Sequence, residues 1–137
     1  MNRRDFQKIA EVRLRESKAL LTARFPEGAY YLAGYAVECA LKACIAKRTR
    51  EHDFPEKKMV NDSHTHDLGK LLNLAELKDE LDAVIGADPA MQSALDKIQD
   101  WSETSRYQRR TAQEADALLK AIEDQTGGLL PWIRLHW

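Results

Sequence analysis

Four residues with polar side-chain atoms and one glycine recur at three- and four-residue spacing in one short stretch. They are Tyr31, Gly34, Tyr35, Glu38 and Lys42. This spacing places them on one stripe of an α-helix, and Glu38 followed by Lys42 is the order that stabilises an ion pair one turn apart. The glycine leaves a gap where a ligand or another backbone can approach. The stripe predicts either a ligand or partner surface, or a helix seam with a satisfied salt bridge and packed tyrosines.

A second group with binding chemistry is His64, His66 and Asp67. Imidazole and carboxylate are ligands for zinc or iron, but only two or three ligands are local, and the chain has neither a His-Glu-x-x-His helix nor a paired-cysteine knuckle. Such polar clusters also begin helices, because an oxygen of Thr65 or Asp67 can accept backbone N–H bonds while His66 packs over the first turn. We therefore expect no metal here.

A third group lies in the connection Trp101–Tyr107, where Arg106 stands beside Tyr107. A guanidinium can pair with phosphate while an aromatic ring stacks on a base, which predicts a phosphate clamp. The alternative is that Arg106 caps helix carbonyls and Tyr107 fills the edge of the core. A further basic cluster is interrupted by acidic residues, which favours a solvated loop over a nucleic-acid site. Its members are Lys47, Arg48, Arg50, Lys57 and Lys58.

Length and composition indicate a single soluble globular domain without a cofactor. The chain has 137 residues, with 21 Lys+Arg, 22 Asp+Glu and 44% hydrophobic residues. A core of this size forms without disulfides or a structural metal. Residues 1–60 carry 13 basic and 8 acidic side chains (+5), and residues 61–137 carry 8 and 14 (−6). The asymmetry favours two solvated faces of opposite sign, although one end could face phosphates.

Apolar residues follow a helical period through nearly the whole chain, which predicts an all-α up-and-down bundle of four to six helices. The first helix is expected near residues 3–24. The second, residues 29–46, has only two charged residues and is expected at the centre of the bundle. A polar loop is expected at about residues 48–66. Helices should follow from residue 67 to the break at 86–89, from there to near residue 101, and from residue 111 to the glycines at 127–128.

Several features concern the location of the chain and its partners. Cys39 and Cys44 lie about 140° apart on the second helix and read as buried thiols that cannot bridge. The N-terminal segment lacks the apolar run of a secretory signal, which predicts a cytoplasmic protein. The charged pair and polar flanks of the second helix argue against membrane insertion.

The Trp-rich C-terminal tail, residues 129–137, must dock on the bundle or on a partner chain, because it would otherwise leave a large apolar patch exposed to solvent.

Three segments together carry a family resemblance. The run GAYYLAGYAVECALKA from Gly28 to Ala43, then His66-Asp67-Leu68 with Leu71-Leu72, then Trp101 and Arg106-Tyr107, resembles the HEPN domain family over about residues 5–125. These are the nucleotide-binding helical domains of higher eukaryotes and prokaryotes. The resemblance implies about five helices and often a homodimer. It also implies functions that range from nucleotide binding, through partnership with a minimal nucleotidyltransferase, to ribonuclease toxins of toxin–antitoxin and defence systems.

One departure from the family decides among these functions. The ribonuclease members carry an Arg, four to six residues, and a His, and no His in this chain has an Arg at that spacing. The expected function is therefore a non-catalytic nucleotide- or RNA-phosphate-binding module. The alternatives are a ribonuclease with a degenerate site, Arg48 with His52 or His66 with Arg106, and an oligomerisation scaffold whose interface is the tail. By similarity, the ligand-binding residues are Tyr35, Glu38, Lys42, His66, Asp67, Arg106 and Tyr107.

Overall fold

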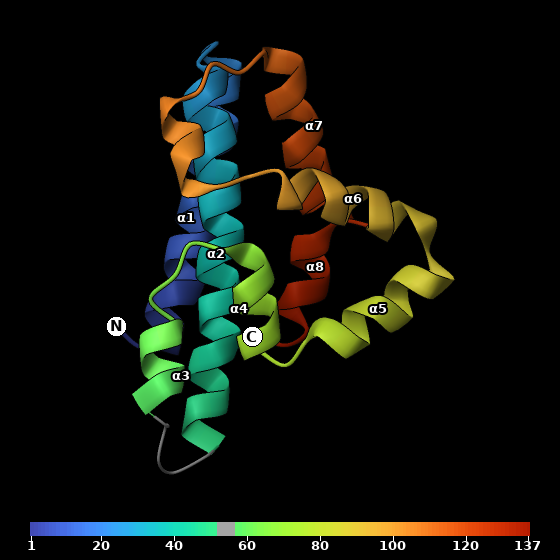
Figure 1. Ribbon diagram of the computed structural model, residues 1–137. Coiled ribbons are helices and arrows are strands. Elements are labelled where there is room, and N and C mark those ends of the chain that lie inside the picture. Colours follow the sequence, from blue (N-terminus) through green and yellow to red (C-terminus); the bar gives the residue numbers. More distant parts are fainter. Residues whose placement is uncertain (52–56) are drawn as a thin grey trace.

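The computed structural model of the chain describes residues 1–51 and 57–137, with side chains up to Thr49 and again from Lys57. Within these ranges every regular element is helical, which confirms the predicted all-α fold (Figure 1). The elements are α1 (Arg3–Thr22), α2 (Pro26–Glu51), α3 (Lys57–Asp62), α4 (Leu68–Leu74), α5 (Lys78–Ala87), α6 (Pro89–Gln99), the 3-10 helix η1 (Glu103–Tyr107), α7 (Ala112–Glu123) and α8 (Leu129–Arg134).

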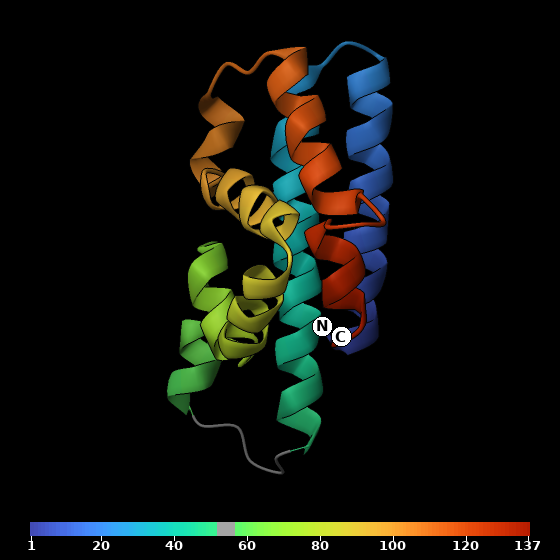
Figure 2. The ribbon, with the colours of Figure 1, turned by 90° about the vertical axis from the view of Figure 1, so that its right-hand side faces the viewer.

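Helices α1 and α2 form an antiparallel pair that runs the length of the molecule (Figures 1 and 2). Helix α1 begins at Asn2, whose side chain accepts from the backbone N–H of Asp5, while the Asp5 carboxylate accepts from the backbone N–H of Asn2. This reciprocal cap satisfies two of the free backbone donors at the helix start. The chain turns at Arg24, which adopts a φ of 68°, and Pro26 then occupies the first position of α2, where its missing N–H costs nothing.

Helix α2 lies at the centre of the bundle, as predicted, and contacts α1, α4, α7, α8 and η1. Five of its alanines are fully buried, which lets neighbouring helices approach its backbone closely; they are Ala29, Ala33, Ala36, Ala40 and Ala43. Because apolar residues surround α2, its sequence lacks the one-sided pattern of a surface helix. None of the described helices is both long enough and apolar enough to cross a membrane.

The predicted polar loop at residues 48–66 is wrong for part of its length. Helix α2 continues to Glu51, and α3 occupies Lys57–Asp62. No residue of α3 is buried, so the segment gives no apolar period by which to recognise it. Lys58 and Asp62 form an ion pair of 2.6 Å one turn apart on α3. A helix that is stabilised by such ion pairs and buries no apolar face cannot be recognised from the periodicity of apolar residues.

Helices α4 and α5 are separated by a turn that the apolar pattern does not signal. Glu76 adopts a φ of 54°, and the backbone N–H of Leu77 donates to the carbonyl of Leu72 at 3.1 Å. This bond and the left-handed residue before it form the arrangement that commonly ends a helix. A glycine is the usual residue at such a position, and because Glu76 stands there instead, the end of the helix has no sequence signal.

The Trp-rich tail, residues 129–137, packs on its own bundle as α8 and the residues that follow it. Leu129, Leu130 and Ile133 are buried. Arg134 donates twice to the Glu11 carboxylate of α1, from Nε at 2.8 Å and from Nη2 at 2.9 Å. Of the two docking options for the tail, the structure therefore shows the intramolecular one.

Cys39 and Cys44 are free thiols, and both are buried. Burial raises the pKa of Cys39 to about 11 and the pKa of Cys44 to about 12. The thiolate is the reactive form, so at pH 8 the native thiols should react with iodoacetamide more than about 100-fold more slowly than those of the urea-unfolded chain. Mass spectrometry of timed samples measures the two rates. Rapid labelling of the folded protein would contradict the burial of these side chains.

Candidate functional site

The predicted stripe on α2 holds a row of aromatic rings. Tyr31 stacks on Tyr35 with ring centroids 6.2 Å apart, and on Trp101 with centroids 6.0 Å apart. The indole Nε1 of Trp101 donates to the Tyr31 carbonyl at 3.2 Å. The gap at Gly34 is filled by the Trp101 ring, because a Cβ built on Gly34 would lie 2.3 Å from three indole atoms. The stripe therefore anchors the segment that leads from α6 into η1.

Glu38 lies one turn beyond Tyr35 and is a buried carboxylate, with its side chain 1% exposed. Lys42 Nζ donates to Glu38 Oε1 at 2.9 Å, which is the ion pair that the spacing predicts. The same carboxylate faces Nδ1 of His66, with Oε1 at 2.9 Å and Oε2 at 3.0 Å. A buried carboxylate is costly unless it is paired and hydrogen-bonded, and here Lys42 and His66 share that role. Burial also raises the pKa of the neighbouring Tyr35 phenol, as do Cys39 and Glu38.

His66 links α2 to η1. Its Nε2 lies 3.2 Å from Oε2 of Glu103, the first residue of η1. The two ring nitrogens of His66 therefore face two carboxylates, Glu38 on α2 and Glu103 on η1. Glu103 is not among the predicted site residues, because it lies 37 positions beyond His66 and no local pattern joins the two. The only hint in the sequence was that Glu103 lies in the same connection as the predicted site residue Arg106.

Arg106 and Tyr107 stand at the exposed end of η1. Tyr107 is 79% exposed, compared with 61% for Phe25, the other exposed aromatic side chain among the described residues. The Arg106 guanidinium lies over the Tyr107 ring, 4.9 Å from its centroid. The pKa of Arg106 is raised chiefly by the Tyr107 side chain beside it, with a smaller effect of Tyr31. Tyr107 therefore does not fill the edge of the core, and both side chains face solvent.

The predicted group of His64, His66 and Asp67 does not converge on one point. Asp67 is the N-cap of α4 and accepts from the backbone N–H of Lys70 at 3.0 Å, and Thr65 Oγ1 accepts from the backbone N–H of Asp67 at 3.2 Å. These bonds are the helix start that the sequence offered as the alternative to a metal. Among the described side chains, those of residues 1–49 and 57–137, no three of His, Cys, Asp or Glu are placed to hold a metal ion.

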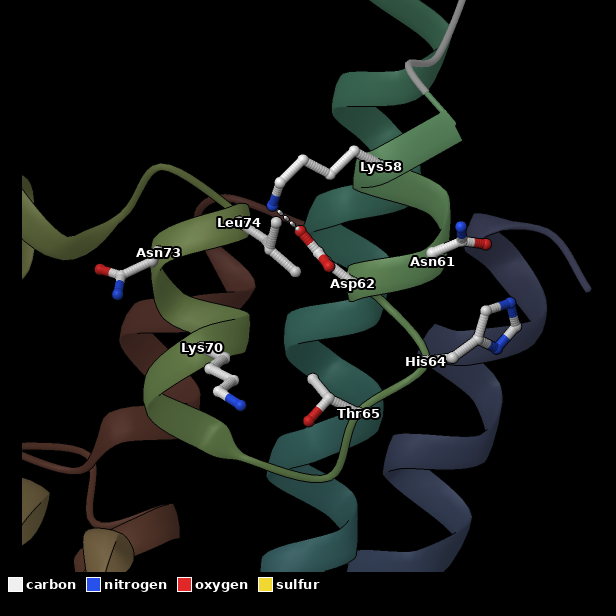
Figure 3. Close-up of a pocket in the computed structure, with 8 residues that line it drawn as sticks. All are labelled: Lys58, Asn61, Asp62, His64, Thr65, Lys70, Asn73 and Leu74. Carbon is white, nitrogen blue, oxygen red and sulfur yellow. Dashed lines mark hydrogen bonds and ion pairs between the residues drawn. The ribbon is translucent and has the colours of Figure 1, made fainter.

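Two open hollows flank the segment around His66. One, of about 520 Å³, lies between the start of α4 and η1 and is lined by His66, Asp67, Trp101 and Glu103 among others. The other, of about 560 Å³, lies between α3 and α4 (Figure 3). There the Lys58 ammonium reaches the Asp62 carboxylate, and Thr65 and Lys70 border the same space (Figure 3). Both hollows contain carboxylates, so neither offers a phosphate a purely cationic lining.

The interrupted basic cluster is only partly described. Arg48 forms an ion pair with Glu76 at 2.5 Å, which ties the end of α2 to the turn after α4. The side chain of Arg50 and the whole of His52 lie outside the described residues, and with them the degenerate Arg48 and His52 site. Lys57 and Lys58 belong to the exposed helix α3. Arg48 thus has a structural ion-pair partner, and the remaining cluster residues share no described site.

The chain was compared with protein-family profiles, with curated proteins and with solved structures. The sequence profile of the HEPN domain matches residues 4–126, which include the α2 stripe, His66, Glu103 and the Arg106-Tyr107 pair. Comparisons with curated proteins and with solved structures gave no significant match. The profile match covers nearly the whole chain, so the chain belongs to the HEPN domain family, which supports a role connected with nucleotides or RNA in general.

Proposed function

We propose that this chain is a non-catalytic module that binds a nucleotide or an RNA phosphate at η1. The observation that carries the proposal is the Arg106-Tyr107 pair, an exposed guanidinium over an exposed ring with no acidic partner within ion-pair distance among the described residues. Five other described arginines form ion pairs with carboxylates: Arg13, Arg48, Arg109, Arg110 and Arg134. A guanidinium that has no carboxylate partner and lies beside an aromatic face suits a phosphate and the base attached to it.

The other predicted ligand residues support this site by holding η1 in place. Glu38 and Lys42 fix His66, and His66 faces Glu103 at the start of η1. Tyr35 stacks on Tyr31, which in turn stacks on Trp101. Asp67 starts α4 and so sets the backbone next to His66. Under the proposal, Arg106 and Tyr107 contact the ligand, and the others position the segment that carries them.

The geometry around His66 supports a binding role over a ribonuclease role. A general base needs a ring nitrogen with a free lone pair near the 2′-hydroxyl. Both nitrogens of His66 face carboxylates, at 2.9 Å from Glu38 and 3.2 Å from Glu103. The ring is thereby engaged in holding two elements together. The ribonuclease alternative would be supported if His66→Ala relieved growth arrest caused by expression of the chain.

Substitution of Arg106 by alanine tests the proposal. We expect the affinity for ATP, GTP or a short single-stranded RNA to fall at least about tenfold, since a charge-assisted bond contributes about 1.5–3 kcal/mol. The melting temperature of the unliganded protein should not change, because Arg106 is exposed. Isothermal titration calorimetry and thermal unfolding measure the two quantities.

Arg15→Ala is the matched control, because Arg15 is exposed on α1 and has no described ion-pair partner. It should leave binding unchanged if the effect of Arg106 is local and not a general loss of positive charge. Unchanged affinity in Arg106→Ala, or no binding of any of the three ligands by the wild type, would overturn the proposed site.

The proposal includes the partners that the family resemblance implies, a second copy of the chain and a nucleotidyltransferase. Phe25 and Leu135 are 61% and 77% exposed, so apolar side chains remain for contact with another protein. Light scattering of the purified chain gives its mass in solution, and a mass of one chain at micromolar concentration would remove the homodimer. Copurification with the nucleotidyltransferase encoded beside it, where there is one, tests the second partner.

A further inference from the structure

A third hollow, of about 320 Å³, lies away from η1 and is not used by the proposed function. It is bordered by the start of α1, the C-terminal half of α2 and the residues between α3 and α4. Its lining includes Arg3, Phe6, Lys42, Ile45, Ala46 and His64. We infer that this hollow binds a small organic anion, a carboxylate that carries a short apolar group.

The apolar part of the ligand is accommodated by one face of α2 and the first turn of α1. Lys42, Ile45, Ala46 and Thr49 recur at three- and four-residue spacing, so they line the hollow from one side of the helix. Phe6 packs against the core from α1 and faces the same space. Ile45 is 6% exposed. A lining of this kind removes an alkyl or aryl group from water, which is the main source of affinity for small ligands.

The charged part of the lining has one sign. Arg3, Lys42 and His64 border the hollow, and no carboxylate is among its described lining residues. Arg3 Nη2 donates to the Trp137 carbonyl, while its Nε is buried without a described partner. Lys42 Nζ contacts the Glu38 carboxylate, which does not itself line the hollow. The nearest acidic side chain of α1, Asp5, is committed to the helix cap with Asn2.

His64 joins this hollow to the one between α3 and α4. Its ring is turned away from Thr65 and Lys70, toward α1 (Figure 3). No described carboxylate pairs with it, in contrast to His66 two residues later. Arg3, Lys42 and His64 thus come from three separate segments and meet around one apolar floor. A carboxylate head group in the mouth of the hollow would be attracted by the charges of Arg3 and Lys42 and can accept a hydrogen bond from the His64 ring, and the attraction to the two charges weakens with added salt.

Hexanoate is a suitable probe, with 1-hexanol and hexylamine as neutral and cationic controls of the same length. When the full chain is titrated with hexanoate and monitored by ¹H–¹⁵N correlation spectra, the amide signals of Ile45, Ala46 and Phe6 should change their chemical shifts. We expect 1-hexanol to bind at least about tenfold more weakly, because it lacks the charge-assisted bonds. Hexylamine should produce no shifts at these amides.

Two variants of lining residues, each compared with a control variant elsewhere, test the location of the site. Ala46→Leu fills the hollow and should weaken hexanoate binding at least about tenfold, whereas Ala83→Leu, on the exposed face of α5, should leave it unchanged. His64→Gln should weaken binding by a smaller factor. Arg106→Ala should have no effect on hexanoate, which separates this site from the nucleotide site.

Three results would overturn the inference. The first is that hexanoate at about 50 mM changes none of these amide chemical shifts, because a dissociation constant above that concentration would mean no useful affinity. The second is equal affinity for hexanoate and 1-hexanol, which would mean that the hollow is an apolar crevice only. The third is unchanged binding in Ala46→Leu. None of these results bears on the nucleotide site, so the failure of one proposal leaves the other standing.

Discussion

Replacement of Gly34 by alanine is expected to lower the free energy of unfolding by about 2 kcal/mol. The new Cβ would lie 2.3 Å from Cδ2, Cε2 and Nε1 of Trp101, well inside contact distance. Trp101 cannot yield cheaply, because it is 4% exposed, stacks on Tyr31 and donates to the Tyr31 carbonyl. Either the indole is displaced or α2 moves away from it. The free-energy cost of either rearrangement exceeds the stabilisation of up to about 1 kcal/mol that alanine brings to a helix interior in place of glycine.

Gly86→Ala is the matched control for this substitution. Gly86 is also helical, in α5, but a Cβ built there meets nothing within 4 Å. The control should be neutral or stabilising by less than about 1 kcal/mol, because only the helical preference changes. Urea unfolding of the two variants measures the difference. Equal effects would show that the Trp101 ring does not occupy the Gly34 gap.

A double-mutant cycle identifies the cause of the destabilisation. Trp101→Ala alone should cost about 3–5 kcal/mol, because it removes a buried aromatic ring. If the clash is with Trp101, adding Gly34→Ala to that variant should cost nothing further, and the two effects will not add. Additive effects would place the strain elsewhere on α2. Because Trp101 leads into η1, Gly34→Ala should also weaken nucleotide binding at Arg106 without touching it.

The parts of this site that could be predicted from sequence are those within one helix turn of each other. The spacing of Glu38 and Lys42 predicted their ion pair, and the structure shows it at 2.9 Å. The placement of Thr65 and Asp67 predicted a helix start, and both side chains accept backbone N–H bonds there. In each case the geometry of a single helix determines which atoms meet, so no knowledge of the fold is needed.

The contacts that assemble the site could not be predicted, because they depend on how separate helices pack. His66 meets Glu38 from 28 positions away, and Glu103 meets His66 from a different element again. The family resemblance grouped Glu38 with His66, but it did not include Glu103. The helix α3 was missed for a related reason. It buries nothing, and its ends are set by neighbours that an apolar pattern does not report.

Replacement of Lys42 by methionine should lower the free energy of unfolding by about 1–3 kcal/mol. The methionine keeps the length of the side chain but removes the donor that lies 2.9 Å from Glu38. Glu38 is 1% exposed and would then depend on His66, whose side chain is 48% exposed. A buried charge left with one partner costs more than the pair contributed to stability, because water cannot replace the missing bond.

Lys78→Met is the matched control, because it breaks an ion pair of nearly the same geometry at the surface. Lys78 Nζ lies 3.0 Å from Asp82 Oδ1, one turn along α5, and the two side chains are 46% and 56% exposed. Its removal should cost about 0.5 kcal/mol or less, since exposed pairs of this type contribute little. Urea unfolding compares the two variants. A cost for Lys42→Met as small as that of the control would mean that Glu38 is solvated.

The double variant Glu38→Gln with Lys42→Met separates the structural role of Lys42 from a role in ligand binding. Neutralising Glu38 removes the unpaired charge, so the double variant should recover most of the stability lost in Lys42→Met. Its affinity for a nucleotide then decides the function of Lys42. Affinity near that of the wild type would leave Lys42 as a residue that positions His66 and η1. An affinity about tenfold below that of the single variant Glu38→Gln would instead return Lys42 to the ligand site that the family resemblance implies.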